Sequence, residues 1–253
     1  MTTQGKLFLA PIRKNIKNAL DIATGTGIWA IEFAQQFPEA EVIGTDLSPI
    51  QPEYVPKNCR FEIDDAEDEW AFRTKFDFIH GRALLSCFRD PGAVIRQAFN
   101  ALVPGGYLEF QDGIFPMSYV GPERTDTALY RWNELVLSGA ERAGLCWTNV
   151  QHYKRLFEEA GFEDVVERRF YWPMSPWPKG RYYKSIAALF QEDMLSGLEG
   201  FSFKALGLHG WSTDKILEFL EDVRKDMKDT SIHAYITVVI VYGRKPSGAS
   251  QVS

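Results

Sequence analysis

The chain has 253 residues and is 45% hydrophobic, which is enough for one α/β domain with a large core. A formal net charge of −6 argues against a broad electrostatic grip on nucleic acid, so direct binding of DNA or RNA is not expected. No stretch approaches the ~20 apolar residues that span a bilayer, and the cysteines form no C-x-x-C pair, so we expect no membrane partner and a cytoplasmic or nuclear location.

Strands and helices alternate through the first half of the chain. Apolar and β-branched residues predict strands over 19–23, 41–45, 60–63, 76–80 and 107–112. Apolar residues at helical spacing predict helices over 28–37 and 91–102, which end at Pro38 and at the run Pro104-Gly105-Gly106. Because parallel strands need a crossover helix between them, this alternation predicts a right-handed, doubly wound sheet.

The second half of the chain adds helices and two further strands. Helical patterns cover 125–144, 149–161, 182–195 and 213–227, and strands are predicted over 162–172 and 234–242. We therefore predict an α/β fold with a mostly parallel, seven-stranded sheet in a single domain over residues 1–246. A helical lid is expected as an insertion at about 173–230, before the last strand, and residues 247–253 are expected to form a flexible tail.

Polar residues recur where the predicted parallel strands end. The first strand carries Asp21, the second ends at Asp46, and the third runs into the acidic pair Asp64-Asp65. The fourth and fifth strands end in His80-Gly81-Arg82 and in Gln111-Asp112. Open parallel sheets bind ligands outside the carboxyl ends of their strands, so these residues are expected to share one crevice.

A glycine turn, Ala23-Thr24-Gly25-Thr26-Gly27, joins the first strand to the first helix and would aim backbone N–H groups at a ligand. Asp46 follows about 20 residues later, the separation at which an acid meets a ribose diol in nucleoside-binding β-α-β units. A dinucleotide fingerprint reads G-x-G-x-x-G, and its third glycine is missing here. The turn therefore favours S-adenosylmethionine over NAD, with a nicotinamide-dependent oxidoreductase as an alternative.

Four segments stand in order along the chain: LDIATGTG at 20–27, VIGTDLSPIQP at 42–52, FEIDDAED at 61–68 and LVPGGYLE at 102–109. Together they resemble the successive motifs of class I S-adenosylmethionine-dependent methyltransferases, and most closely the fungal LaeA-like group. The resemblance extends to residues 5–12, 233–235 and 243–246, so it covers nearly the whole chain. It implies a Rossmann-like methyltransferase fold, S-adenosylmethionine as the cofactor and a role in secondary metabolism.

The resemblance also implies which residues contact the cofactor. Those lining its methionine part would be Asp21, Ala23, Thr24, Gly25, Thr26 and Gly27. Asp46 would hold both ribose hydroxyls. The residues at the adenine would be Leu47, Asp64, Asp65 and the Ala66 backbone, and those bordering the methyl donor would be His80, Gly81 and Arg82.

The chain departs from the family pattern at two places. Ala23 stands at the first glycine position, so we expect its φ to be negative, because a Cβ disfavours positive values. Family members usually carry a longer region before the segment that matches residues 5–12, and its shortness here would leave the cofactor pocket more open.

The resemblance leaves the acceptor unidentified, so the substrate residues are hypotheses. His80 is either a general base or a strand-end histidine with a structural role. Gln111 and Asp112 would orient the substrate. Trp177 and Trp211 either pack in the core or line a pocket for a flat organic molecule. No histidine has a helical i, i+4 partner, so a metal site is not expected.

The leading hypothesis is a methyltransferase that acts on a small molecule of secondary metabolism or on a regulatory substrate. The alternative is a non-catalytic protein with a methyltransferase fold that regulates secondary metabolism by binding a protein partner. Cofactor binding and methyl transfer distinguish these two classes, because the second requires neither.

Overall fold

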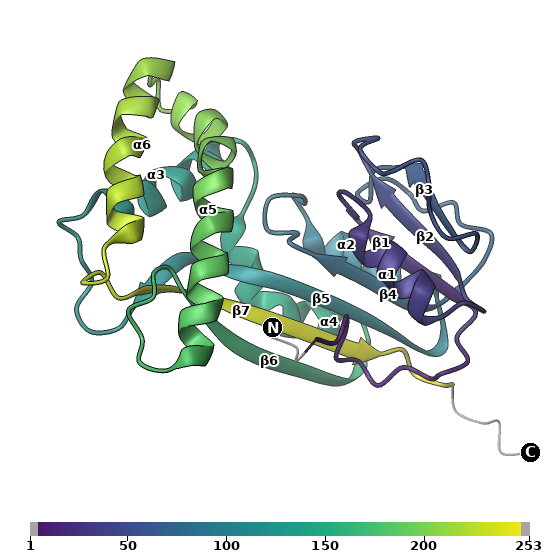
Figure 1. Cartoon of the computed structure of the whole chain (residues 1–253). Helices are drawn as coiled ribbons and strands as arrows, with labels where there is room; N and C mark the ends of the chain where they lie inside the picture. Colours follow the sequence, from purple (N-terminus) through teal and green to yellow (C-terminus); the bar gives the residue numbers. More distant parts are fainter. Residues whose placement is uncertain (1–4, 249–253) are drawn as a thin grey trace, which may run out of the picture. The chain divides into compact units, whose positions relative to one another are not determined.

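The computed structural model describes residues 5–248 and contains a seven-stranded sheet with the strand order β3-β2-β1-β4-β5-β7-β6 (Figure 1). The strands are β1 (Asn18–Ile22), β2 (Glu41–Asp46), β3 (Cys59–Ile63), β4 (Phe76–Arg82), β5 (Leu102–Tyr119), β6 (Glu163–Pro173) and β7 (Ala234–Arg244). Strands β1 to β5 pair in parallel. Strand β7 runs antiparallel to β5, because Gly105 bonds to Lys245 near one end and Val120 bonds to His233 near the other. The predicted doubly wound, mostly parallel sheet is confirmed.

Three of the six α-helices of the described residues begin at a side-chain cap. The six are α1 (Ile28–Gln36), α2 (Pro91–Ala101), α3 (Ala128–Arg142), α4 (Tyr153–Glu159), α5 (Arg181–Gly207) and α6 (Thr213–Lys228), with a short 3₁₀ helix at Trp147–His152. The side chains of Asp90, Thr127 and Ser212 accept hydrogen bonds from backbone N–H groups in the first turns of α2, α3 and α6. Within residues 5–248, none of these helices is long and apolar enough to cross a membrane.

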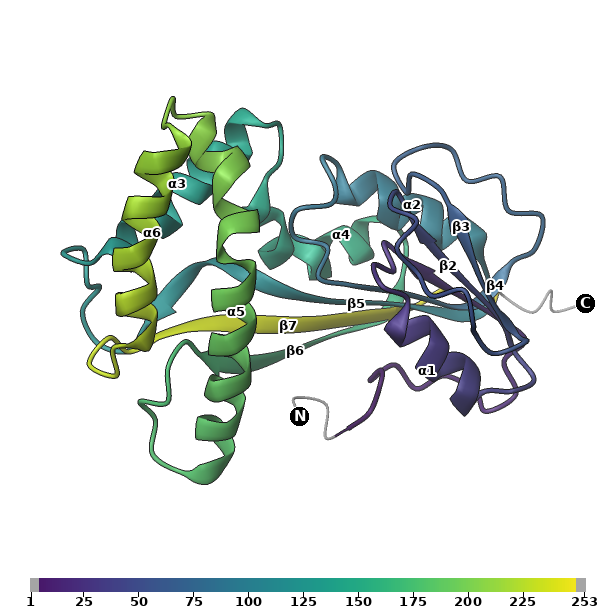
Figure 2. The same ribbon diagram turned by 45° about the horizontal axis from the view of Figure 1, so that its top comes forward.

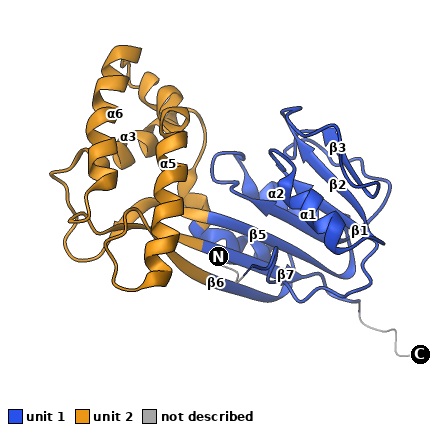
Figure 3. Ribbon diagram, in the orientation of Figure 1, with its two compact units in different colours: residues 1–112, 151–168, 239–253 blue, residues 113–150, 169–238 orange. Residues whose placement is uncertain are grey.

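The chain divides into two compact units, coloured separately in Figure 3. Unit 1 comprises residues 1–112, 151–168 and 239–253, and unit 2 comprises residues 113–150 and 169–238. The expected lid at about 173–230 falls in unit 2, which also contains α3. A single domain with a lid stays a prediction, and residues 249–253 of the expected tail lie outside the described residues.

Unit 1 has helices on both faces of its part of the sheet (Figure 2). On one face, Trp29 and Phe33 of α1 pack near Phe78 of β4. On the other face, the Phe110 ring of β5 meets Tyr153 and Phe157 of α4 edge-on. Successive strand residues point to opposite faces, so Glu109 faces the α1 side while Phe110 faces α4.

Unit 2 is built around α3, α5 and α6, which pack against one another. A Cβ added at Gly139 of α3 would lie 2.5 Å from the Ala205 carbonyl oxygen of α5, so only glycine permits this close approach of the two helices. The buried Trp132 indole N–H donates to Ser202 Oγ at 2.8 Å and joins the same helices.

Two elements are longer than their sequence patterns predict. Helix α5 was expected to end near residue 195 but continues to Gly207, because Leu198 and Leu206 are fully buried and outweigh the cost of Gly197 and Gly200 inside the helix. Strand β5 was expected over 107–112 but extends to Tyr119, where it contributes to unit 2.

Candidate functional site

The turn after β1 has an unusual backbone. Ala23, Gly25 and Gly27 all have positive φ, at 49°, 58° and 78°. The expectation that Ala23 keeps a negative φ is therefore wrong, and its side chain is held in the left-handed region that glycine favours. A Cβ at Gly27 would lie 2.3 Å from the Phe61 ring, whereas a Cβ at Gly25 would meet nothing within 4 Å. Gly27 is thus needed for packing, and Gly25 borders open space.

Asp46, at the end of β2, holds this turn in place. Its Oδ2 accepts the Gly25 N–H at 2.8 Å and its Oδ1 accepts the Ser48 N–H at 2.9 Å. The Thr24 N–H also donates to the Thr45 carbonyl of β2 at 2.9 Å. A carboxylate offers about four lone-pair sites, so Asp46 keeps capacity for further donors such as hydroxyl groups.

Exposed apolar side chains surround the same edge of the sheet. Leu47 follows β2 and is 66% exposed, Ile63 ends β3 and is 68% exposed, and Ile28 begins α1 and is 53% exposed. Asp64 and Asp65 follow Ile63 and are half-buried, and burial raises the pKa of the Asp64 carboxyl. This edge can therefore offer an apolar surface and acidic acceptors to one ligand.

His80 and Asp21 form a buried pair across β4 and β1. His80 Nδ1 lies 2.7 Å from Asp21 Oδ1, and the other Asp21 oxygen accepts the Thr24 hydroxyl. The His80 ring is 0% exposed and stacks on the Trp29 indole, with the centroids 3.8 Å apart and the planes at 3°. If Nδ1 carries the proton toward Asp21, Nε2 is a lone-pair acceptor, and it has no hydrogen-bond partner among the described residues.

The two residues after His80 differ in accessibility. Gly81 is buried, and a Cβ there would lie 2.8 Å from Leu84 and 3.0 Å from Ile22. Arg82 is exposed. Gly81 therefore lets the chain pack closely, and Arg82 can reach a ligand or solvent.

Glu109 is a functional candidate that the sequence reasoning missed. It is fully buried on β5, in register with His80, and its carboxylate accepts the backbone N–H groups of Leu9 and Ala10 at 2.8 and 2.6 Å. Burial raises the pKa of the Glu109 carboxyl, and His80 and these N–H donors oppose the rise. An acid inside an apolar strand was the available signal.

The segment at residues 7–10 also forms hydrogen bonds with Trp29 and Gln111. Its Leu7 carbonyl accepts both the Trp29 indole N–H and the Gln111 amide N–H, each at 3.0 Å. Gln111 also donates to Glu109 at 2.7 Å. A chain of contacts thus runs from residues 7–10 through Trp29 to the His80 ring.

The four predicted substrate residues have different surroundings. Gln111 uses its amide N–H groups in the bonds above, and Asp112 is buried and accepts the Tyr153 hydroxyl at 3.0 Å. Trp177 and Trp211 belong to unit 2. The Trp211 ring has the Lys215 ammonium 4.2 Å from its centroid, and the Trp177 indole N–H donates to the Ala234 carbonyl. Within unit 1, Gln111 contacts Glu109 and Leu7. A role of the four residues in binding the substrate stays a prediction.

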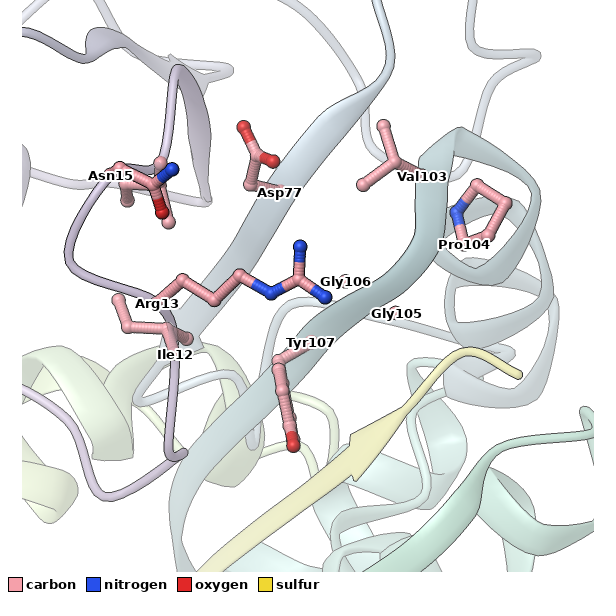
Figure 4. A pocket seen from close by; sticks show the side chains of 10 residues that line it. Ile12, Arg13, Asn15, Asp77, Val103, Pro104, Gly105, Gly106 and Tyr107 are labelled. Carbon is pink, nitrogen blue, oxygen red and sulfur yellow. The ribbon is translucent and has the colours of Figure 1, made fainter. Parts of the chain in front are cut away.

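A small cavity in unit 1 lies at the opposite ends of the strands. Arg13, Asp77 and Gly106 are among the residues that line it, and Figure 4 shows the Arg13 side chain extending toward Gly106. Its volume is about 90 Å³. Ligand pockets usually measure about 300–1,000 Å³, so this cavity is too small for a nucleoside cofactor.

The chain is similar to known proteins over most of its length. Residues 3–167 match a family described as a methyltransferase domain. Methyltransferase pytC of Aspergillus terreus is 34% identical over 244 residues, which cover 95% of this chain and 75% of that protein. Secondary metabolism regulator laeA of Monascus pilosus is 32% identical over 231 residues, which cover 90% of this chain and 63% of that protein.

A solved structure shares the fold. It is phosphoethanolamine N-methyltransferase 2 of Haemonchus contortus in complex with S-adenosyl-L-methionine, with a TM-score of 0.55 and 18% identity. The match covers 91% of this chain and 49% of that one, so this chain spans about half the length of that protein.

Proposed function

This chain belongs to the methyltransferase domain family, and we propose that it transfers the methyl group of S-adenosylmethionine to a small-molecule acceptor. The observation that carries the proposal is the pairing of Gly25 with Asp46. The Gly25 N–H donates to Asp46, and a Cβ at Gly25 would meet no protein atom within 4 Å. The glycine turn and the acid therefore border the same open space. A nucleoside cofactor needs both features.

The residues around this opening suit the separate parts of the cofactor. Asp46 would accept hydrogen bonds from the ribose hydroxyls with its remaining lone pairs. Leu47 and Ile63 would cover the adenine, because both side chains are mostly exposed. Leu47 directly follows Asp46, and Ile63 lies two residues before Asp65. The turn at residues 23–27 would line the methionine part, and Arg82 would border the methyl donor.

When bound, the cofactor supplies a methyl group on a positively charged sulfur for in-line displacement by the acceptor. The protein's main contribution is to align the acceptor and to exclude water. We propose His80 as the group that removes a proton from a phenol, acid or amine, with Nε2 as the accepting atom. Because the ring is fully buried, this role requires the acceptor to reach Nε2 from within the site.

Acceptor positioning is proposed for Gln111 and Asp112 of β5 and for Trp177 and Trp211 of unit 2. The similarity to secondary metabolism regulator laeA supports an acceptor from fungal secondary metabolism. The test is incubation of the full chain with methyl-labelled cofactor and fungal metabolite extracts. We expect label in an extract component with the wild type and much less label with Asp46→Asn at the same cofactor concentration. A protein that binds the cofactor yet labels nothing across such extracts argues against methyl transfer.

A second candidate function is regulation without catalysis, through a protein partner. The similarity to secondary metabolism regulator laeA supports it. Under this alternative, variants that abolish cofactor binding leave the regulatory effect on metabolite production unchanged. Under the leading proposal, Asp46→Asn weakens the metabolic effect together with cofactor binding.

A further inference from the structure

Unit 2 contains a pocket that shares only Trp177 with the residues proposed above to act in methyl transfer. Its volume is about 450 Å³, which lies in the range of pockets that hold small organic ligands. Four aromatic rings line it: Tyr171 from β6, Trp177 from the following loop, Tyr183 from α5 and Tyr235 from β7. All lining residues belong to unit 2, so the pocket is complete within that unit.

Two walls of this pocket are held by contacts within the protein. The Trp177 indole N–H donates to the Ala234 carbonyl at 3.1 Å, and its ring stacks on His233 with the centroids 4.7 Å apart. The Tyr171 and Tyr235 rings meet edge to face, at 5.6 Å and 80°. Rings fixed before binding lose little side-chain entropy when a ligand arrives, so the pocket is preorganised.

The shape of the lining favours a flat ligand. Aromatic rings attract other rings in offset-stacked or edge-to-face arrangements, and here four rings from β6, the following loop, α5 and β7 line one pocket. Tyr171 and Tyr183 are 48% and 40% exposed, so their rings also offer apolar surface that a ligand would remove from water.

Lys179 is the charged residue among those that line the pocket. The structure records no ion pair for it within residues 5–248, so its charge is available to a ligand. An ammonium group repels cations and attracts an acid group placed beside it, and the attraction strengthens where apolar rings exclude water. The lining therefore combines aromatic rings with one positive charge.

We propose that this pocket binds a planar aromatic molecule that carries one acidic group, with the rings against Trp177 and Tyr235 and the acid at Lys179. The proposal uses only residues of unit 2 and does not rest on methyl transfer. If the aromatic acid does not bind, the proposed cofactor site is unaffected. If the protein transfers no methyl group, the proposed binding in this pocket is unaffected.

Calorimetric titration of the full chain with 2-naphthoate, and with the neutral 2-naphthalenemethanol as a matched ligand, tests the proposal. We expect saturable one-to-one binding of 2-naphthoate, about tenfold tighter than the neutral compound, with an affinity that falls as salt rises. Lys179→Gln should remove the preference for the anion while leaving the neutral compound unaffected. Lys184→Gln, which changes an exposed lysine of α5 outside the pocket, should change neither affinity.

A second variant tests the contribution of an aromatic lining residue to binding and should leave the fold intact. Tyr183 is partly exposed on α5, so Tyr183→Ser should weaken both ligands while the thermal unfolding midpoint stays near that of the wild type. The proposal is overturned if 2-naphthoate does not bind saturably. Equal affinity for the two ligands, or an unchanged preference in Lys179→Gln, overturns it as well.

Discussion

The Gly25 backbone N–H donates to Asp46 Oδ2 at 2.8 Å, which ties the turn after β1 to the end of β2. Gly25 follows β1, Asp46 ends β2, and these two strands pair in parallel. Gly25 has a φ of 58° and open space where a side chain would lie, so the pair borders space that a ligand can enter.

Gly25→Ala should leave the protein folded but weaken binding of S-adenosylmethionine at least about tenfold. The new Cβ meets no protein atom, so the cost to stability is limited to about 1–2 kcal/mol for an alanine in the left-handed region. The same Cβ would project into the space that we assign to the cofactor. Calorimetry with the cofactor measures the effect, and an affinity equal to that of the wild type would place the cofactor elsewhere.

Gly27→Ala is the matched substitution in the same turn, and it should damage stability instead. Its Cβ would overlap the Phe61 ring, so overpacking of about 1–3 kcal/mol adds to the left-handed penalty. Urea unfolding of both variants checks the contrast. Equal losses of stability in Gly25→Ala and Gly27→Ala would contradict the packing described here.

Ala23→Gly should stabilise the protein slightly or leave its stability unchanged, although Ala→Gly usually destabilises. Alanine at a φ of 49° costs about 1–2 kcal/mol, which exceeds the roughly 0.5–1 kcal/mol that glycine's chain entropy costs. Ala30→Gly, in the buried part of α1, is the control and should lower the free energy of unfolding by about 1 kcal/mol or more. A similar loss in both variants would contradict the strain at Ala23.

Much of the fold and of this site could be predicted from local patterns. Asp46 ends β2, His80 lies two residues before the end of β4, and the geometry of parallel sheets brings such strand ends to one edge. The Asp21 and His80 positions lie side by side in the β1 and β4 register, so their contact follows once the strands are assigned.

The features that could not be predicted depend on contacts distant in sequence. Glu109 holds the backbone of Leu9, 100 residues earlier, and no local pattern encodes that bond. The positive φ of Ala23 contradicts the preference of alanine and persists because the surrounding turn imposes it. Helix α5 continues past Gly197 because packing in unit 2 overrides local propensity.

Asn58→Ala should lower the free energy of unfolding by about 1–3 kcal/mol. The Asn58 side-chain amide donates to the carbonyls of Ala34, Phe37 and Ala40 at 3.0, 3.1 and 2.8 Å, which satisfies the end of α1 and the turn after it. Asn58→Asp keeps the shape but turns an acceptor oxygen toward these carbonyls, so it should cost at least as much. Denaturant unfolding provides the measurement, and a fully stable Asn58→Asp would contradict this role.

Glu109 should make the protein less stable as pH rises, whereas an ion-paired acid makes a protein more stable as pH rises. Burial raises the pKa of the Glu109 carboxyl above the ordinary 4.5. The protonated side chain's contribution to the free energy of unfolding is therefore fully present below about pH 4.5 and is lost as pH rises through the folded-state pKa. Glu109→Gln removes this titration. The wild type's advantage over the variant should therefore shrink as pH rises, in urea unfolding across this range.

The control for Glu109 is Glu32→Gln, which removes one negative charge from the exposed face of α1. It should not reproduce the pH trend of Glu109→Gln. An advantage of the wild type over Glu109→Gln that grows with rising pH would show that the buried carboxylate has a lowered pKa.

Calorimetric titration of the full chain with S-adenosylmethionine, for the wild type, Asp46→Asn and the exposed control Asp193→Asn, tests the cofactor site most directly. We predict micromolar binding by the wild type and the control. Each charge-assisted hydrogen bond lost contributes about 1.5–3 kcal/mol, so Asp46→Asn should bind at least about tenfold more weakly. Folded wild-type protein that releases no binding heat across a temperature series, or Asp46→Asn that binds as tightly as the wild type, would contradict the proposed site.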